Sequence, residues 1–159
     1  MEMPLAEVAL RLGMAAIAGM AIGLNRDLRD KPMGARTLGL VSLGAALAAV
    51  STVQYANLHD HPDALSRVVQ GIIQGVMGGI SFIGAGVILR DWRSQSVTGL
   101  TTAATVWVAA ALGIACGLAA WRAAAVGVGL ALFMLVAVGW IERAIWKEDD
   151  EDRDRPRRN

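Results

Sequence analysis

Residues 79–117, GISFIGAGVILRDWRSQSVTGLTTAATVWVAAALGIACG, decide the fold. Two apolar segments rich in small residues meet at a short polar loop, whose members include Arg90, Asp91, Arg93, Ser94, Gln95 and Ser96. Each segment extends far enough to cross a bilayer, which takes about 20 residues at about 1.5 Å per residue. The sequence therefore predicts a transmembrane helical hairpin, and with it a membrane protein.

The composition of the whole chain agrees with this class. Its 159 residues fit one domain, and 55% hydrophobic residues with a mean hydropathy of +0.46 exceed the ordinary soluble range. The net charge of +1 favours neither nucleic acid nor an acidic partner. Cys116 is the only cysteine, so an intrachain disulfide is excluded and a small buried side chain is expected.

Five apolar segments are interpreted as transmembrane helices, in an all-α bundle. They cover residues 5–24, 37–54, 68–89, 98–118 and 123–141, and Ser96 or Thr98 is expected to cap the fourth. Twelve lysines and arginines lie on one side of these spans and two on the other, which places the N-terminus outside and the C-terminus in the cytoplasm. Residues 1–146 are predicted to form the membrane domain. Residues 147–159, which mix acids and bases, are predicted to be a disordered cytoplasmic tail.

Two groups of charged residues at the first span have alternative interpretations. Arg11 follows Glu7 by four residues, so it either pairs with Glu7 near the membrane interface or faces the bundle interior. Residues 25–36 form a polar turn containing Asn25, Arg26 and Arg36. Such a turn serves either as a cytoplasmic topology signal or as a site for lipid phosphates.

Small and polar residues in the third and fourth spans predict contacts with other helices or with a solute. Gly71, Gly75 and Gly79 are spaced four apart, which predicts close packing of another helix. The polar residues within these two spans include Gln70, Gln74, Ser81, Thr101 and Thr102. Because unpaired polar groups are costly in hydrocarbon, these side chains either form hydrogen bonds within the bundle or line a solute path. Arg90 beside a helix N-terminus either attracts an anion or acts as an orientation signal.

No pattern in the chain predicts an enzyme, a metal centre or a cofactor site. His59 and His61 lie close to Asp60 and Asp63, but all are neighbours on one short loop before Pro62, so a solvated turn is favoured over a metal site. Patterns for serine hydrolases, zinc proteases, P-loops and dithiol motifs are absent.

Two blocks resemble the MgtC/SapB family of bacterial inner-membrane proteins. They are GLNRDLRDKPMGARTLGLVSLGAAL from Gly23, and GISFIGAGVILRD followed by SVTGLTTAATVWVAAALGIACG. The resemblance implies a multi-pass inner-membrane protein with five helices and a cytoplasmic C-terminus. It also implies links to growth at low magnesium, magnesium homeostasis and virulence through survival in macrophages, with membrane partners that include the ATP synthase or small membrane peptides.

This chain departs from the family pattern in two places. The family usually has a glutamate where this chain has Asn25, so a role that needs that carboxylate is in doubt. Many members also carry a soluble C-terminal domain, whereas this chain ends in the charged tail.

Two functions follow as hypotheses. The first is a non-enzymatic regulator that contacts other membrane proteins, or further copies of itself, through small residues such as Gly19, Gly23, Gly113 and Gly117. The alternative is a small ion or solute transporter, with Arg11, Gln70, Gln74, Ser81 and the threonines along its path. Direct Mg²⁺ transport is the weaker version, because Mg²⁺ prefers carboxylate oxygens and the third to fifth spans carry none at mid-membrane depth.

Overall fold

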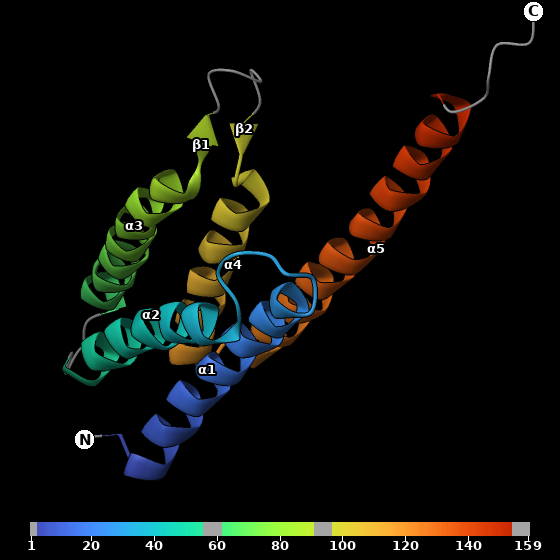
Figure 1. Ribbon diagram of the computed structural model, residues 1–159. Coiled ribbons are helices and arrows are strands. Elements are labelled where there is room, and N and C mark those ends of the chain that lie inside the picture. Colours follow the sequence, from blue (N-terminus) through green and yellow to red (C-terminus); the bar gives the residue numbers. More distant parts are fainter. Residues whose placement is uncertain (1–2, 56–61, 91–96, 154–159) are drawn as a thin grey trace, which may run out of the picture.

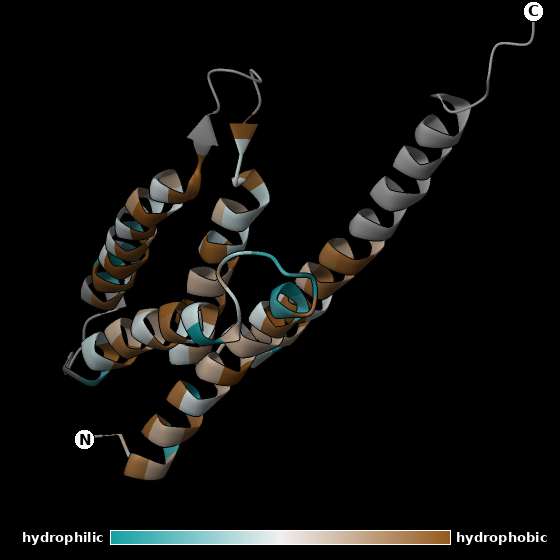
Figure 2. Cartoon of the chain, in the orientation of Figure 1, coloured by the Kyte–Doolittle hydropathy of each residue, from teal (hydrophilic) through white to brown (hydrophobic). Residues whose placement is uncertain are grey.

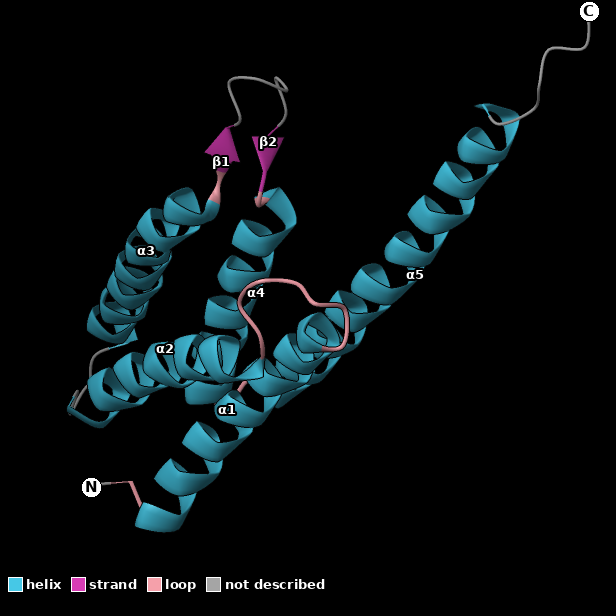
Figure 3. Cartoon of the chain, viewed as in Figure 1, coloured by secondary structure: helices cyan, strands magenta, loops and turns pink. Residues whose placement is uncertain are grey.

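The computed structural model describes residues 3–55, 62–90 and 97–153, and this part of the chain is almost entirely helical. The helices are α1 (Leu5–Asp27), α2 (Ala35–Tyr55), α3 (Pro62–Val87), α4 (Leu100–Gly117) and α5 (Trp121–Arg153). Between α3 and α4 lie two short antiparallel strands, β1 (Leu89–Arg90) and β2 (Val97–Thr98) (Figures 1 and 3).

The helices have the length and apolar character of membrane spans. Within the described residues, α1 to α4 each hold a stretch long and apolar enough to cross a membrane, and the apolar part of α5, Trp121–Ala137, is shorter. The prediction of an all-α membrane protein is confirmed. The orientation of the termini stays a prediction.

The last helix differs from the sequence prediction at its C-terminal end. α5 continues to Arg153, so residues 147–153 are helical where a disordered tail was predicted. Four of the seven residues in this segment, the lysine, two glutamates and arginine, are good helix formers, whereas the three aspartates are poor ones. Helix propensity therefore accounts for only part of the difference. Residues 154–159 lie outside the described part, and the division into a membrane domain and a tail stays a prediction.

The core is formed where α2 crosses both α1 and α4. Gly19 and Gly23 of α1 lie against the α2 backbone, and Gly113 and Gly117 of α4 do the same from another side. Fully buried alanines and Val106 fill the space between these contacts. Small residues at crossing points let helix backbones approach closely. These four glycines, predicted from the sequence to contact other membrane proteins or further copies, are buried against α2 of this chain, so that prediction is wrong for them.

The glycines of α3 do not pack in this way. A Cβ atom added at Gly71, Gly75 or Gly79 would meet nothing within 4 Å. No helix of this chain packs on them within the described residues, so the predicted close packing of another helix stays a prediction for a helix from outside the chain. The physical reason is that α3 packs against α4 through a different face, where Gly84 lies near Ala103.

The turn between α3 and α4 also differs from the predicted helical hairpin. Leu89 pairs with Thr98 and Arg90 with Val97. The helix α3 therefore ends two residues before the predicted end of the third span, and α4 begins two residues after the predicted start of the fourth. The N-cap of α4 is Gly99, with φ of 89° and no side-chain cap bond, rather than Ser96 or Thr98. The β-branched Val97 and Thr98 favour extended backbone, and glycine readily adopts the left-handed conformation that follows.

Candidate functional site

A buried arginine marks the candidate site. Arg26 is 4% exposed and lies in the last turn of α1, so the helix extends into the turn predicted at residues 25–36. Its Nε donates a hydrogen bond to the Pro32 carbonyl at 3.0 Å, and its Nη2 donates to Thr102 Oγ1 of α4 at 2.5 Å. The side chain thus joins α1, the loop that follows and the start of α4.

The loop after α1 is held by further contacts of its charged residues. Asp27 Oδ2 accepts a hydrogen bond from the Ala35 N–H at 2.8 Å, which satisfies one free donor at the start of α2. Arg29 Nη1 donates to the Leu135 carbonyl of α5 at 3.0 Å. Hydrophilic residues gather at this end of α1 and in the loop (Figure 2). Hydrogen bonds therefore fix this polar segment to the helices at one end of the core.

The charge of Arg26 is not neutralised by a neighbouring acid. Its described hydrogen-bond partners are neutral oxygens, and it forms no ion pair with any described carboxylate. Thr105 Oγ1 donates to the Thr102 carbonyl at 2.8 Å, which fixes the turn that presents Thr102. Charges within membrane helices are costly and usually functional. This arrangement holds a positive charge, hydrogen-bonded to neutral oxygens, at the end of the core where α1 meets the following loop.

Arg11 forms a matching contact at the other end of α4. Its Nη2 donates to the Glu7 carboxylate, and its Nη1 donates to the Gly117 carbonyl at 2.9 Å. Arg11 thus combines the two predicted alternatives, because it pairs with Glu7 and its side chain, 12% exposed, also faces α4 inside the bundle. The contact with Gly117 also places positive charge at the negative end of the α4 dipole.

The two arginines clamp α1 against α4 at equal spacing. Arg11 and Arg26 are fifteen residues apart, as are Gly117 and Thr102 on the antiparallel helix. Fifteen residues correspond to about 22 Å of helix. The spacing of the arginines was visible in the sequence, but their acceptors, two carbonyls and a hydroxyl, had no local signal. The roles of Asp27 and Arg29 were missed for the same reason.

The other predicted site residues are not brought to this cluster. Gln70 and Gln74 are exposed on α3 and form no hydrogen bond within the described part of the chain, and Thr101 and Arg36 are also exposed. Ser81 Oγ donates to the Met77 carbonyl of its own helix at 2.7 Å, and no hydrogen bond joins it to another helix within the described residues.

The remaining predicted residues divide into one that the structure describes and several that it does not. Asn25 is described and is partly buried, next to Arg26 in sequence. The side chain of Arg90 lies outside the described residues, as do Asp91 and the pair His59 and His61.

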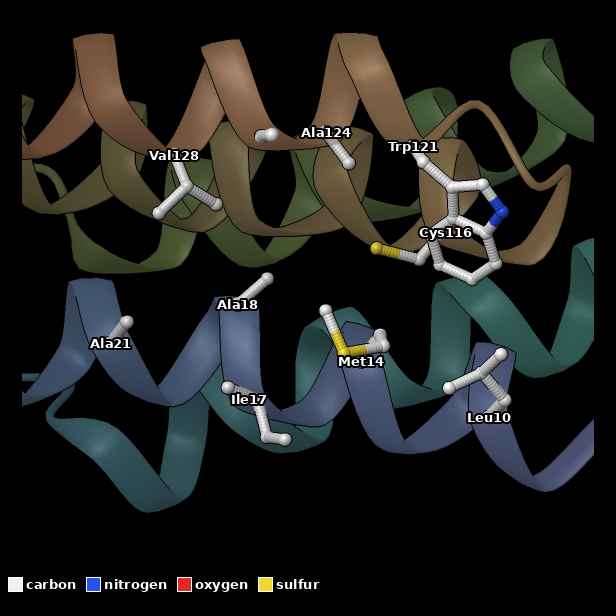
Figure 4. Close-up of a pocket in the computed structure, with 10 residues that line it drawn as sticks. Leu10, Met14, Ile17, Ala18, Ala21, Cys116, Trp121, Ala124 and Val128 are labelled. Atoms are coloured by element: carbon white, nitrogen blue, oxygen red, sulfur yellow. The ribbon is translucent and has the colours of Figure 1, made fainter.

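An apolar groove separates α1 from α5. It has a volume of about 490 Å³, and Met14 and Ile17 of α1 lie across it from Trp121 and Val128 of α5 (Figure 4). Cys116, predicted to be a small buried side chain, is 1% exposed and lines this groove. No charged residue lines it, so the groove is suited to hydrocarbon rather than to an ion.

Comparison with known proteins identifies the family. The model of the MgtC family matches residues 12–144. The chain belongs to the MgtC family. This match confirms the resemblance carried by the two sequence blocks and includes Arg26, Pro32 and Thr102.

Individual relatives are similar over most of the chain. SapB of Bacillus subtilis is 32% identical over 93% of this chain and 63% of its own length. YhiD of Escherichia coli K12, named a putative magnesium transporter, is 43% identical over 70% of this chain and 51% of its own length. MgtC of Salmonella typhimurium is 39% identical over 69% of this chain and 42% of its own length.

The matched region is shorter than these proteins. The chain spans between 42% and 63% of the length of the three relatives. No solved structure matches the chain.

Proposed function

We propose that this MgtC-family protein is a non-enzymatic regulator of bacterial inner-membrane proteins, linked to adaptation to low magnesium, stress and survival inside host cells. It acts through contacts between its own helices and a helix of a membrane partner. The protein crosses the inner membrane several times, with its N-terminus outside and its C-terminus in the cytoplasm, as the distribution of lysine and arginine favours.

The observation that carries this proposal is the open face of α3. No residue in the apolar window of the span Leu65–Val87 is buried, in contrast to the spans of α1, α2 and α4. Gln70, Gln74 and Ser81 share one face of this helix, because they follow one another by four and seven residues. An amide facing hydrocarbon without a partner is costly, and a helix with polar side chains supplies the missing hydrogen bonds.

The buried charge of Arg26 also supports a regulator over a cation conductor. A Mg²⁺ path requires oxygen ligands, and a fixed cation in the core opposes the passage of another cation. Transport nevertheless remains the second candidate, because the relative YhiD is named a putative magnesium transporter. The two candidates predict different results for ion flux.

Replacing both Gln70 and Gln74 with leucine tests the regulatory surface. We expect the double variant to reach the membrane in normal amount, because the change makes an exposed helix face more apolar. We also expect it to lose the ability to restore growth at low magnesium in a bacterium that lacks its own copy of the gene. The measurement is growth rate together with the amount of protein in the membrane fraction.

The matched control is Gln54→Leu, the same change at an exposed glutamine of α2. We expect it to restore growth as the unchanged protein does. Normal growth with the double variant would contradict the proposed role of α3. Equal loss with Gln54→Leu would show that added apolar surface, and not the α3 face, causes the defect.

A further inference from the structure

A second groove lies between α2 and α3, on a different side of α3 from the glutamines. Its volume is about 530 Å³, and Val41 and Gly44 of α2 line it together with Gly79 and Ile80 of α3. Ile83 also lines it, two positions after Ser81, and two positions turn a side chain to about the opposite side of a helix. The groove is therefore separate from the surface proposed for a partner helix.

One end of this groove is polar, with Arg36 and Thr37, and the remainder is apolar. Arg36, in the first turn of α2, lines the groove and is exposed. Within the described residues it has neither a hydrogen-bond nor an ion-pair partner. The nearby Asp27 carboxylate is engaged with the Ala35 N–H. An unpaired cation is thus available at the mouth of an apolar groove.

The length of the groove corresponds to one leaflet of a bilayer. Arg36 and Ala45 both line it, and their separation of nine positions corresponds to about 13 Å along α2. Half of a hydrocarbon core about 30 Å thick is about 15 Å. A molecule that fills the groove from Arg36 inward therefore has a negative head group and an apolar tail of leaflet depth.

We propose that this groove binds an anionic phospholipid from the leaflet on the side of Arg36. The lipid phosphate pairs with the Arg36 guanidinium, and one acyl chain lies along Leu40, Val41, Ile80 and Ile83. A zwitterionic head group also has a phosphate, but its own cation offsets that charge, so the preference for anionic lipids resides in Arg36. The inference does not depend on the regulatory role proposed above.

Lipid binding to the whole chain in neutral detergent tests this site. Native mass spectrometry compares phosphatidylglycerol with phosphatidylcholine of the same acyl chains. We expect Arg36→Gln to weaken phosphatidylglycerol binding about fivefold, as for one basic residue at an anionic head group. We expect a smaller loss for phosphatidylcholine, because its choline cation already offsets the phosphate charge. The preference for phosphatidylglycerol should also disappear in about 1 M salt, where the screening length falls to about 3 Å.

A groove-filling variant separates the acyl chain from the charge. A Cβ at Gly44 meets nothing within 4 Å, so Gly44→Leu should fold normally, fill the groove and weaken both lipids. Gly79→Leu repeats the test from the α3 wall, and Gly13→Leu, at an equally open position on α1, should leave lipid binding unchanged. Unchanged phosphatidylglycerol binding in Arg36→Gln, or in both groove-filling variants, would overturn the proposal. Disulfide-linked dimers of Gly44→Cys in a Cys116→Ala background would also overturn it, by showing that a second copy occupies the groove.

Discussion

Replacing Gly113 with leucine is expected to destabilise the protein by about 3 kcal/mol, at the upper end for an overpacked core. A side chain at this position collides with the Ser42 carbonyl oxygen, and its Cβ lies 2.9 Å from the Cβ of Ala45. The obstacle is backbone, which cannot turn away as a flexible side chain can. Because α2 contacts both α1 and α4, separating it from α4 disturbs the whole core.

The folded yield in detergent and the thermal unfolding midpoint measure this effect. Gly13→Leu and Gly129→Leu serve as controls, because a Cβ at either position meets nothing within 4 Å. We expect both controls to keep the yield and midpoint of the unchanged protein. A normal midpoint for Gly113→Leu would mean that α2 and α4 do not pack as described.

Replacing Arg26 with methionine is expected to abolish the restoration of growth at low magnesium while preserving the fold. Methionine is apolar and similar in length, so the cost of burying the charge disappears with the charge. The variant leaves the buried Thr102 Oγ1 without its donor, which costs about 1–3 kcal/mol, whereas the carbonyl of the exposed Pro32 can bond water. These effects oppose one another, so the protein should still enter the membrane.

Arg26→Lys is the matched variant for this prediction. Lysine keeps the positive charge but lacks the planar guanidinium that bonds Pro32 and Thr102 at once. Partial recovery of growth with lysine would assign part of the role to the charge itself. Full growth with Arg26→Met, from a normal amount of membrane protein, would contradict a functional role for this residue.

The sequence predicted the membrane spans well because apolar length depends only on local composition. Small residues were a weaker guide, since a four-residue spacing indicates that a helix can be approached but not which helix approaches it. Gly19 and Gly113 meet α2, whereas Gly75 has the same kind of spacing and meets nothing within 4 Å. The difference between these glycines arises from how α3 packs against α4, which depends on the tertiary structure of the bundle.

The candidate site was predictable only in part. Arg26 was singled out as a polar residue in a conspicuous motif, but its burial depends on α1 continuing through Asp27 and on the loop folding back to place Pro32 beside it. Its contact with Thr102 joins residues 76 positions apart in sequence. The pattern of apolar residues within either helix does not indicate which residues of the two helices come into contact.

Magnesium flux into proteoliposomes containing the purified protein tests the proposed regulatory function most directly. A fluorescent Mg²⁺ indicator trapped inside the vesicles reports entry, and the thermal unfolding midpoint shows that the protein is folded. We predict the same rate of entry as in vesicles without protein, because the buried Arg26 charge opposes cation passage. A protein-dependent rate that saturates with Mg²⁺ and changes in Arg26→Met would contradict this prediction and establish a transporter.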